Sequence, residues 1–254
     1  MIIDTHSHIY YDKYDHDIDD VIKRAIDSDI KKIICVAVDL ESAEKCFNLA
    51  EKFPCVYMTA GIHPHDAKNI PKNYLHQIET YLNYKKNVGL GEIGLDYHYN
   101  FSDPQIQLPI YIDQLELAKT YKLPAVIHCR EAENDILNGI ISTKSNQGVI
   151  HCFSGDFTFA KKILNTGYKI SFTGLITFTG ESYKEVIQEV NLSNIMVETD
   201  SPYLTPSPNR GKRNEPKYVR YVVDQISKWK NLSFKDVSDE TTKTALTVFP
   251  KLLN

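Results

Sequence analysis

The chain alternates short apolar runs with longer segments in which apolar residues recur at helical spacing. Several short runs, among them IICVAV, AVIH and IMVE, are almost continuously apolar, which is typical of parallel strands covered on both faces. The pattern predicts eight strands, at Ile2–Thr5, Lys32–Val38, Cys55–Gly61, Val88–Gly94, Ala125–His128, Gly148–His151, Lys169–Thr173 and Ile195–Glu198.

Helical segments are expected between these strands and after the last one. Those between strands lie at Asp19–Asp29, Ser42–Lys52, Asn73–Tyr84, Pro104–Tyr121, Glu131–Ile141, Phe157–Asn165 and Tyr183–Glu189. Pro216–Lys228 follows the last strand, and a final helix is opened by Ser233, with Asp236 three residues later as in a capping box. Pro109, inside the fourth helix, predicts a bend or a late start there.

Strict alternation of strands and helices predicts either a (β/α)8 barrel or a doubly wound sheet. Histidines and carboxylates stand at the carboxyl ends of most predicted strands, and only a barrel gathers those ends on one rim. We therefore expect a single TIM-barrel domain of the α/β class over residues 1–254, with an extra C-terminal helix. The proline-rich, basic stretch Ser201–Glu215 follows the last strand, where a loop of this length is expected to be functional.

Composition narrows the class of protein further. Lysine and arginine number 29 against 33 acidic residues, and this net charge of −4 argues against nonspecific nucleic-acid binding over the whole surface. The N-terminus lacks the features of a secretory signal, and no apolar run has the length of a membrane span. The five cysteines are scattered, which indicates reduced thiols in a cytoplasmic protein. Without a long apolar stripe, we expect a monomer.

Three residues in the first half of the chain are candidate metal ligands. His6 and His8 lie two apart on a strand and point to the same side, where both can bind one cation; the alternative is a hydrogen-bonded surface pair. Glu92, in VGLGEIGLDYH, lies near the end of an apolar strand. A carboxylate buried there is costly unless it is paired or bound to a metal, and the alternative partner is Arg130.

Three more candidates follow at the ends of later strands. His128 in AVIHCR and His151 in GVIHCF end consecutive strands, and Asp200 follows the last strand in IMVETDSPYL. Together with the first three, they place four histidines and two carboxylates on one rim. This set suits two divalent cations such as Zn²⁺ or Mn²⁺, with a carboxylate bridging them. His63, in GIHPHDA, is expected to reach the same mouth as a substrate contact or as support for a ligand.

Seven stretches resemble the motifs of the TatD family of metal-dependent deoxyribonucleases, namely IIDTHSHI, GIHPHDA, GLGEIGLDYH, LPAVIHCREA, HCFSG, ETDSPYL and RGKRNEP. They run in order from residue 2 to residue 216. The resemblance implies an amidohydrolase-type TIM barrel and a divalent-metal hydrolase that acts on DNA ends. It also implies that one metal is held by His6, His8, Glu92 and Asp200, and the other by Glu92, His128 and His151. The run EAENDI after Arg130 departs slightly from the family pattern, which leaves substrate preference near it open.

Phosphodiester hydrolysis is the first of two chemistries that fit these residues. Two divalent cations (Zn²⁺, Mn²⁺ or Mg²⁺) would activate a water and orient a phosphate, with Glu92 between them and Asp200 as general base. Contacts to substrate phosphates are expected from His63, Arg130, Arg210 and Arg213. The candidates to stack on a terminal base are Tyr97, Tyr99, Phe153 and Tyr203. Together with the resemblance to the TatD family, these residues predict a DNA exonuclease, with single-stranded DNA or a DNA end as its substrate.

Amide or ester hydrolysis on the same metal centre is the second chemistry. The resemblance to the TatD family implies one such activity, the release of D-amino acids from mischarged tRNA, which the basic loop also suits. A non-catalytic barrel is disfavoured by the intact ligand set. The native metal stays open, because histidine and carboxylate ligands accept several divalent cations.

Overall fold

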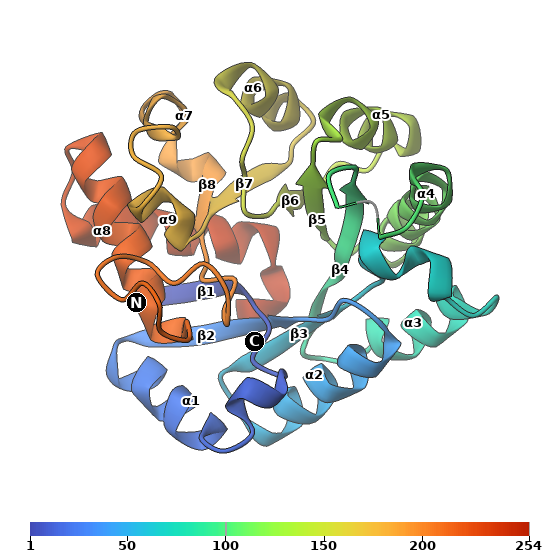
Figure 1. Ribbon diagram of the computed structural model, residues 1–254, viewed down its shortest axis with the longest axis horizontal. Coiled ribbons are helices and arrows are strands. Elements are labelled where there is room, and N and C mark those ends of the chain that lie inside the picture. The colour runs from blue at the N-terminus through green and yellow to red at the C-terminus, as the bar shows by residue number, and fades with distance from the viewer. Residues whose placement is uncertain (100, 254) are drawn as a thin grey trace.

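The computed structural model describes residues 1–99 and 101–253, and its strands form one parallel sheet in which neighbours pair in chain order (Figure 1). The strands are β1 (Ile2–Ser7), β2 (Ile30–Val36), β3 (Val56–Ala60), β4 (Asn87–Asp96), β5 (Ala125–Arg130), β6 (Gly148–Ile150), β7 (Lys169–Phe172) and β8 (Ile195–Val197). Ser7 of β1 also bridges Ser201, just after β8, so the eight strands form a nearly closed barrel. The predicted TIM barrel is confirmed.

Helices surround this barrel (Figure 1). They are α1 (Ile18–Asp27), α2 (Leu40–Lys52), α3 (Tyr74–Leu82), α4 (Pro104–Tyr121), α5 (Glu133–Thr143), α6 (Phe157–Asn165), α7 (Lys184–Glu189), α8 (Val219–Lys230) and α9 (Phe234–Val248). The late start expected from Pro109 is wrong, because α4 begins at Pro104 after the N-cap Asp103. Pro109 is exposed, so the missing N–H falls on the solvent side of the helix. None of the helices in the described residues is long and apolar enough to cross a membrane.

The fourth strand is longer than the sequence pattern predicts. It continues to Asp96, which pairs in register with Arg130 of β5. Gly94 permits this approach: its φ is 137°, and a Cβ added there would lie 2.0 Å from the carbonyl oxygen of His128. The sixth strand, in contrast, ends at Ile150, so His151 lies in the turn that follows it.

The last helix closes the N-terminal end of the barrel. On α9, the hydroxyls of Ser238 and Thr242 donate hydrogen bonds of 3.0 and 2.9 Å to the carbonyl of Met1, directly before β1. Side chains of α9 and of the 3-10 helix η6 (Pro250–Leu253) join a buried cluster with strand residues, which comprises Ile3, Ile34, Val36, Tyr57, Val88, Val126, Val149, Met196, Ala245, Val248, Phe249 and Leu252. The carboxyl ends of the strands are left for polar side chains.

A cluster of charged side chains ties the loop after β8 to α1. Arg213 donates to both carboxylate oxygens of Asp17 at 2.8 and 2.7 Å, and to Glu215 at 3.2 Å. Arg24 of α1 donates to Glu215 at 2.8 and 3.0 Å and to Asp17 at 3.0 Å. The hydrogen bonds from Arg213 lower the pKa of Asp17 to about 2. The cluster therefore fixes the loop when both carboxylates are ionised.

We predict that Arg213→Ala lowers the free energy of unfolding by about 1 kcal/mol at pH 7, a value discounted for partial solvent screening. The folded pKa of Asp17 lies below its unfolded value of about 3.9, so its stabilisation is complete above that value and is lost as the pH falls towards 2. The difference between wild type and variant should therefore be smaller at pH 3 than at pH 7 in urea unfolding.

Lys23→Ala is the matched control, because the pair of Lys23 with Asp27 is exposed on the same helix. We expect little change in its stability at either pH. An effect of Arg213→Ala no larger than that of Lys23→Ala would contradict a structural role for the cluster.

Candidate metal centre

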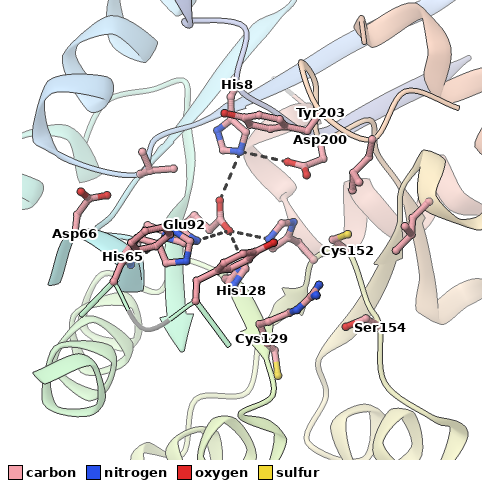
Figure 2. A pocket seen from close by; sticks show the side chains of 18 of the residues that line it. His8, His65, Asp66, Glu92, His128, Cys129, Cys152, Ser154, Asp200 and Tyr203 are labelled. Carbon is pink, nitrogen blue, oxygen red and sulfur yellow. Dashed lines mark hydrogen bonds and ion pairs between the residues drawn. The ribbon is translucent and has the colours of Figure 1, made fainter. Parts of the chain in front are cut away.

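The carboxylate of Glu92 lies at the middle of the open end of the barrel, with imidazoles from several strands around it (Figure 2). Its Oε1 atom lies 2.8 Å from His151 Nε2, 3.2 Å from His128 Nδ1 and 3.4 Å from His63 Nε2. Its Oε2 atom lies 3.2 Å from His6 Nε2 and 3.6 Å from His8 Nε2. The two oxygens of one buried carboxylate thus face two different groups of histidines.

Asp200 completes the group on the Oε2 side. Its Oδ1 atom lies 3.3 Å from His8 Nε2 and 3.9 Å from His6 Nε2. The backbone N–H of Asp200 donates to the carbonyl of His6, which joins the loop after β8 to β1. The structure therefore brings together the six predicted ligands, and it places His63 beside the Oε1 atom as well.

An irregularity in β1 directs its histidines into the mouth of the barrel. Ile3 belongs to the buried cluster beneath the site, whereas His6 faces Glu92. Residues three apart on a regular strand face opposite sides of the sheet. The register with β2 shifts between Asp4 and Ser7, and this bulge allows both side chains to point inward.

In two imidazoles, the ring nitrogen that points away from Glu92 makes a hydrogen bond that fixes the tautomer. The other ring nitrogen then faces the centre without a proton. His8 Nδ1 lies 2.8 Å from the carbonyl oxygen of Val36, which only accepts, so Nδ1 carries the proton. His128 Nε2 lies 3.0 Å from Asp96 Oδ2 and donates to it. In their neutral forms His8 Nε2 and His128 Nδ1 are therefore lone pairs directed at Glu92.

His63 has the opposite tautomer. Its Nδ1 atom accepts the backbone N–H of His65 at 3.2 Å, so its Nε2 atom carries the proton and points it towards Glu92. Burial lowers the pKa of His63 to about 4, which keeps the ring neutral at pH 7. His63 is thus a hydrogen-bond donor to the centre, unlike His8 and His128.

Glu92 is ionised in this environment. Burial would raise the pKa of its carboxyl, but the imidazoles around it, His151 foremost, hold the pKa well below its ordinary value. Burial would also raise the pKa of Asp200, but its contact with His8 outweighs burial, and the pKa of Asp200 is lowered. In turn, the carboxylates raise the pKa of His8, His128 and His151 against the effect of burial, whereas burial lowers the pKa of His6. The centre therefore pairs two ionised carboxylates with imidazoles whose positive forms they stabilise.

These residues fit a divalent cation. A lone pair of His8 or His128 that faces a carboxylate oxygen is repelled by it unless a proton or a metal cation lies between the two groups. Among the described residues, the buried Nδ1 of His6 and both ring nitrogens of His151 have no hydrogen-bond partner. Mixed nitrogen and oxygen ligands suit Zn²⁺, Mn²⁺ and related ions. Three sets have ligand atoms within 4.8 Å of one another: His6, His151 and Asp200; His6, His8 and Glu92; His63, Glu92 and His128.

The centre opens into a cavity of about 480 Å³. Arg130 lines this cavity, and its guanidinium lies 5.9 Å from the ring centroid of Tyr99. Tyr99 and Tyr203 also line the cavity, and their stacking on a terminal base stays a prediction. Phe153 is buried in the core and Tyr97 packs against it, and the lining of the cavity includes neither.

The structure directs two of the predicted phosphate contacts elsewhere. Arg210 donates to the carbonyl of Thr205 at 2.9 Å, and its guanidinium lies 3.7 Å from the ring centroid of Phe178. Arg213 belongs to the ionic cluster with Asp17. Both guanidinium groups therefore contact other residues of the chain. The positive charge of this loop in the sequence did not reveal those contacts.

Two carboxylates at the site were missed in the sequence. Asp96 accepts from His128, and Glu198 accepts the backbone N–H of Cys152 and the hydroxyl of Ser171, both at 2.7 Å. Glu198 Oε1 also lies 3.5 Å from Nδ1 of His151. Both are buried acidic residues at the ends of strands, in the stretches GLD and VETD. An acidic residue at the end of an apolar run was the sequence feature that could have identified them.

Fold and site together define a TIM-barrel hydrolase of the metal-dependent class. The family model described as TatD related DNase matches residues 3–250, so the chain belongs to this family. The resemblance drawn from the motifs is confirmed.

Individual relatives agree with the family. The chain is 36% identical to YabD of Bacillus subtilis (strain 168), an uncharacterized metal-dependent hydrolase, over 98% of this chain and 99% of YabD. It is 30% identical to the 3'-5' ssDNA/RNA exonuclease TatD of Enterobacter lignolyticus, over 93% and 94% of the two chains. The crystal structure of YjjV, a TatD homologue from Escherichia coli K12, aligns with a TM-score of 0.91, 29% identity and 98% coverage of both chains.

The tautomers predict which imidazoles bind metal. In Mn²⁺ titrations followed by electron paramagnetic resonance, His8→Ala and His128→Ala should each weaken binding by roughly tenfold or more, because each removes a lone pair aimed at the centre. His63→Ala should change the affinity less than about threefold, because its N–H faces the centre. A loss in His63→Ala equal to that in His128→Ala would show that His63 is a ligand.

Proposed function

We propose that this protein is a divalent-metal-dependent exonuclease that removes nucleotides from an end of single-stranded DNA. One observation carries the proposal: both oxygens of the buried Glu92 face groups of metal-ligating type at the mouth of the barrel. A TatD relative named as a 3'-5' ssDNA/RNA exonuclease supports the choice of substrate. The expectations of one domain, a cytoplasmic location and a monomeric state stay predictions.

The metals would be held on either side of Glu92. His6, His8 and Asp200 face one of its oxygens, and His128 and His151 face the other. When bound, the two cations supply the positive charge that activates a water and stabilises the leaving oxygen of a phosphodiester. Glu92 lies between the two groups and would contribute to holding both cations.

Asp200 is the proposed general base. Its carboxyl is ionised and lines the cavity, so it is in a state and a place to accept a proton from a water beside the substrate phosphate. The proton it takes would leave to solvent, because its side chain is 15% exposed. Glu92, at 4% exposed, lacks that access and keeps its role at the metals.

Substrate contacts are proposed for His63 and Arg130. The Nε2–H group of His63 would donate to a phosphate oxygen without adding charge to the centre, and Arg130 would supply one cation at the rim. Tyr99 and Tyr203, which are 55% and 46% exposed, offer ring faces to unstacked bases. Such stacking requires an unpaired strand, which favours single-stranded substrate.

Degradation of end-labelled single-stranded DNA tests the proposal, with Glu92→Gln beside the wild type. With added Mn²⁺ or Mg²⁺ the wild type should shorten the strand from one end. Glu92→Gln, which halves the acceptor capacity and removes the charge, should be slower by roughly 1,000-fold. Glu116→Gln, on the exposed face of α4, is the control and should match the wild type.

Two outcomes would contradict the proposal. Undiminished cleavage by Glu92→Gln would remove Glu92 from the centre and point to a contaminating nuclease. Bound metal without loss of DNA would favour the second chemistry, hydrolysis of an ester or amide. Release of the amino acid from aminoacyl-tRNA is then the reaction to measure, because it uses the same centre on another nucleic acid.

The salt dependence of binding tests Arg130. With the inactive Glu92→Gln background, Arg130→Ala should weaken binding of a single-stranded oligonucleotide and reduce the slope of log K against log salt by about 0.7. Arg210→Ala, whose side chain lies on Phe178, should leave the slope unchanged. Fluorescence anisotropy at several salt concentrations gives both slopes. A change in the Arg210 variant alone would assign the phosphate contact to the basic loop.

A further inference from the structure

Asp96, the last residue of β4, holds two imidazoles on one carboxylate oxygen. Its Oδ2 atom lies 2.9 Å from His65 Nε2 and 3.0 Å from His128 Nε2. Its Oδ1 atom accepts the backbone N–H groups of His98 and Tyr99 at 3.0 and 2.9 Å. The side chain is fully buried, and each of these four contacts brings an N–H group to an oxygen. Asp96 therefore acts throughout as an acceptor.

The position of this carboxylate is fixed by the backbone around it. The N–H of Asp96 donates to Gln107 Oε1 at 2.8 Å, and Gln107 Nε2 donates back to the carbonyl of Asp96 at 2.8 Å. Gly94 lets β4 run against the carbonyl of His128, which brings Asp96 beside that imidazole. The distance between Asp96 and His128 is thus set by α4 and by the two strands, independently of any ligand.

We propose that Asp96 is a positioning residue that fixes the tautomer of His128 for metal binding. By accepting the Nε2–H group, it leaves the lone pair of His128 on Nδ1, 3.2 Å from Glu92 Oε1. Metal-binding histidines commonly donate their other N–H group to a carboxylate, which fixes the ring and strengthens the ligand. This inference rests on the proposed metal centre, in which His128 is a ligand.

Glu198, the buried carboxylate beside His151, does not fix the tautomer of that imidazole. Glu198 Oε1 lies 3.5 Å from His151 Nδ1, beyond a good hydrogen bond, and already accepts the N–H of Cys152 at 2.7 Å. Within the described residues, His151 has no hydrogen bond on either ring nitrogen. His128 is therefore the histidine of the Oε1 group whose tautomer a carboxylate determines.

Asp96→Asn tests this role because it changes one atom of the hydrogen-bond pattern. The amide oxygen introduced at this position would stay with the N–H groups of His98 and Tyr99, since an NH₂ group there would face two donors. The NH₂ group would then lie where Oδ2 was, with one hydrogen for each of His65 and His128. Both Nε2 atoms must become acceptors, so the proton of His128 moves to Nδ1, towards the centre.

The first measurement is the tautomer of His128 in the metal-free protein, read from its ring nitrogen shifts by ¹⁵N NMR at a pH where the ring is neutral. We expect protonated Nε2 in the wild type and protonated Nδ1 in Asp96→Asn. The second is Mn²⁺ affinity, which should fall about 10- to 100-fold in the variant. A thermal melt of each protein shows whether the variant is folded, and only a tautomer change in folded protein supports the proposal.

Two matched variants separate tautomer control from general effects. His65→Gln keeps the bond between Asp96 and His128, and Asp135→Asn makes the same chemical change at a carboxylate that bonds Tyr97 instead. Both should keep Nε2 of His128 protonated and bind Mn²⁺ within about threefold of the wild type.

The proposal is overturned if Asp96→Asn keeps Nε2 of His128 protonated, or if its tautomer changes while Mn²⁺ affinity does not. An unfolded Asp96→Asn would also overturn it, by making Asp96 a residue of stability. These results differ from a failure of the proposed function. A wild type that binds Mn²⁺ but leaves DNA intact would refute the exonuclease and leave the tautomer result standing, whereas a wild type that binds no Mn²⁺ refutes both.

Discussion

The open end of this barrel depends on the burial of one carboxylate. Glu92 is ionised on a strand whose every residue is buried, and a charge in that place is costly unless cations or polarised donors surround it. His63 supplies one such donor, and the other imidazoles around Glu92 meet this need only when they carry a proton or bind a metal cation. Each oxygen of Glu92 faces its own group of histidines, so the geometry of the whole mouth follows from this side chain.

The backbone around Glu92 shows how the barrel makes room for it. A Cβ on Gly91 would lie 2.6 Å from Cβ of Val126, and one on Gly61 would lie 2.8 Å from the backbone of Gly91. The fourth strand can therefore lie against both neighbours only with glycine at these positions. At the opposite end, α9 and the apolar side chains of the interior provide the packing that the polar mouth does not, which separates stability from chemistry along the barrel axis.

Much of this arrangement was predictable from the sequence, and the exceptions have physical causes. Strand order and the convergence of the six candidate ligands follow from periodicity and from polar residues at strand ends, because parallel strands bring those ends together. The direction of Arg213 did not follow, since its partner Asp17 stands 196 positions earlier in the chain. Asp96 was missed because β4 continues past its apolar run, where Gly94 allows a close approach that no residue pattern records.

The distribution of positive charge bears on how a nucleic acid would be held. The chain has a net charge of −4, and two arginines of the basic loop are engaged internally, with Asp17 and with Phe178. Arg130 lines the cavity, beside the exposed ring of Tyr99. Electrostatic attraction of a nucleic acid is then confined to the mouth of the barrel. The metal cations of the proposed centre would strengthen this attraction. In the proposed exonuclease, such a surface would hold a strand by its end rather than a duplex along its length.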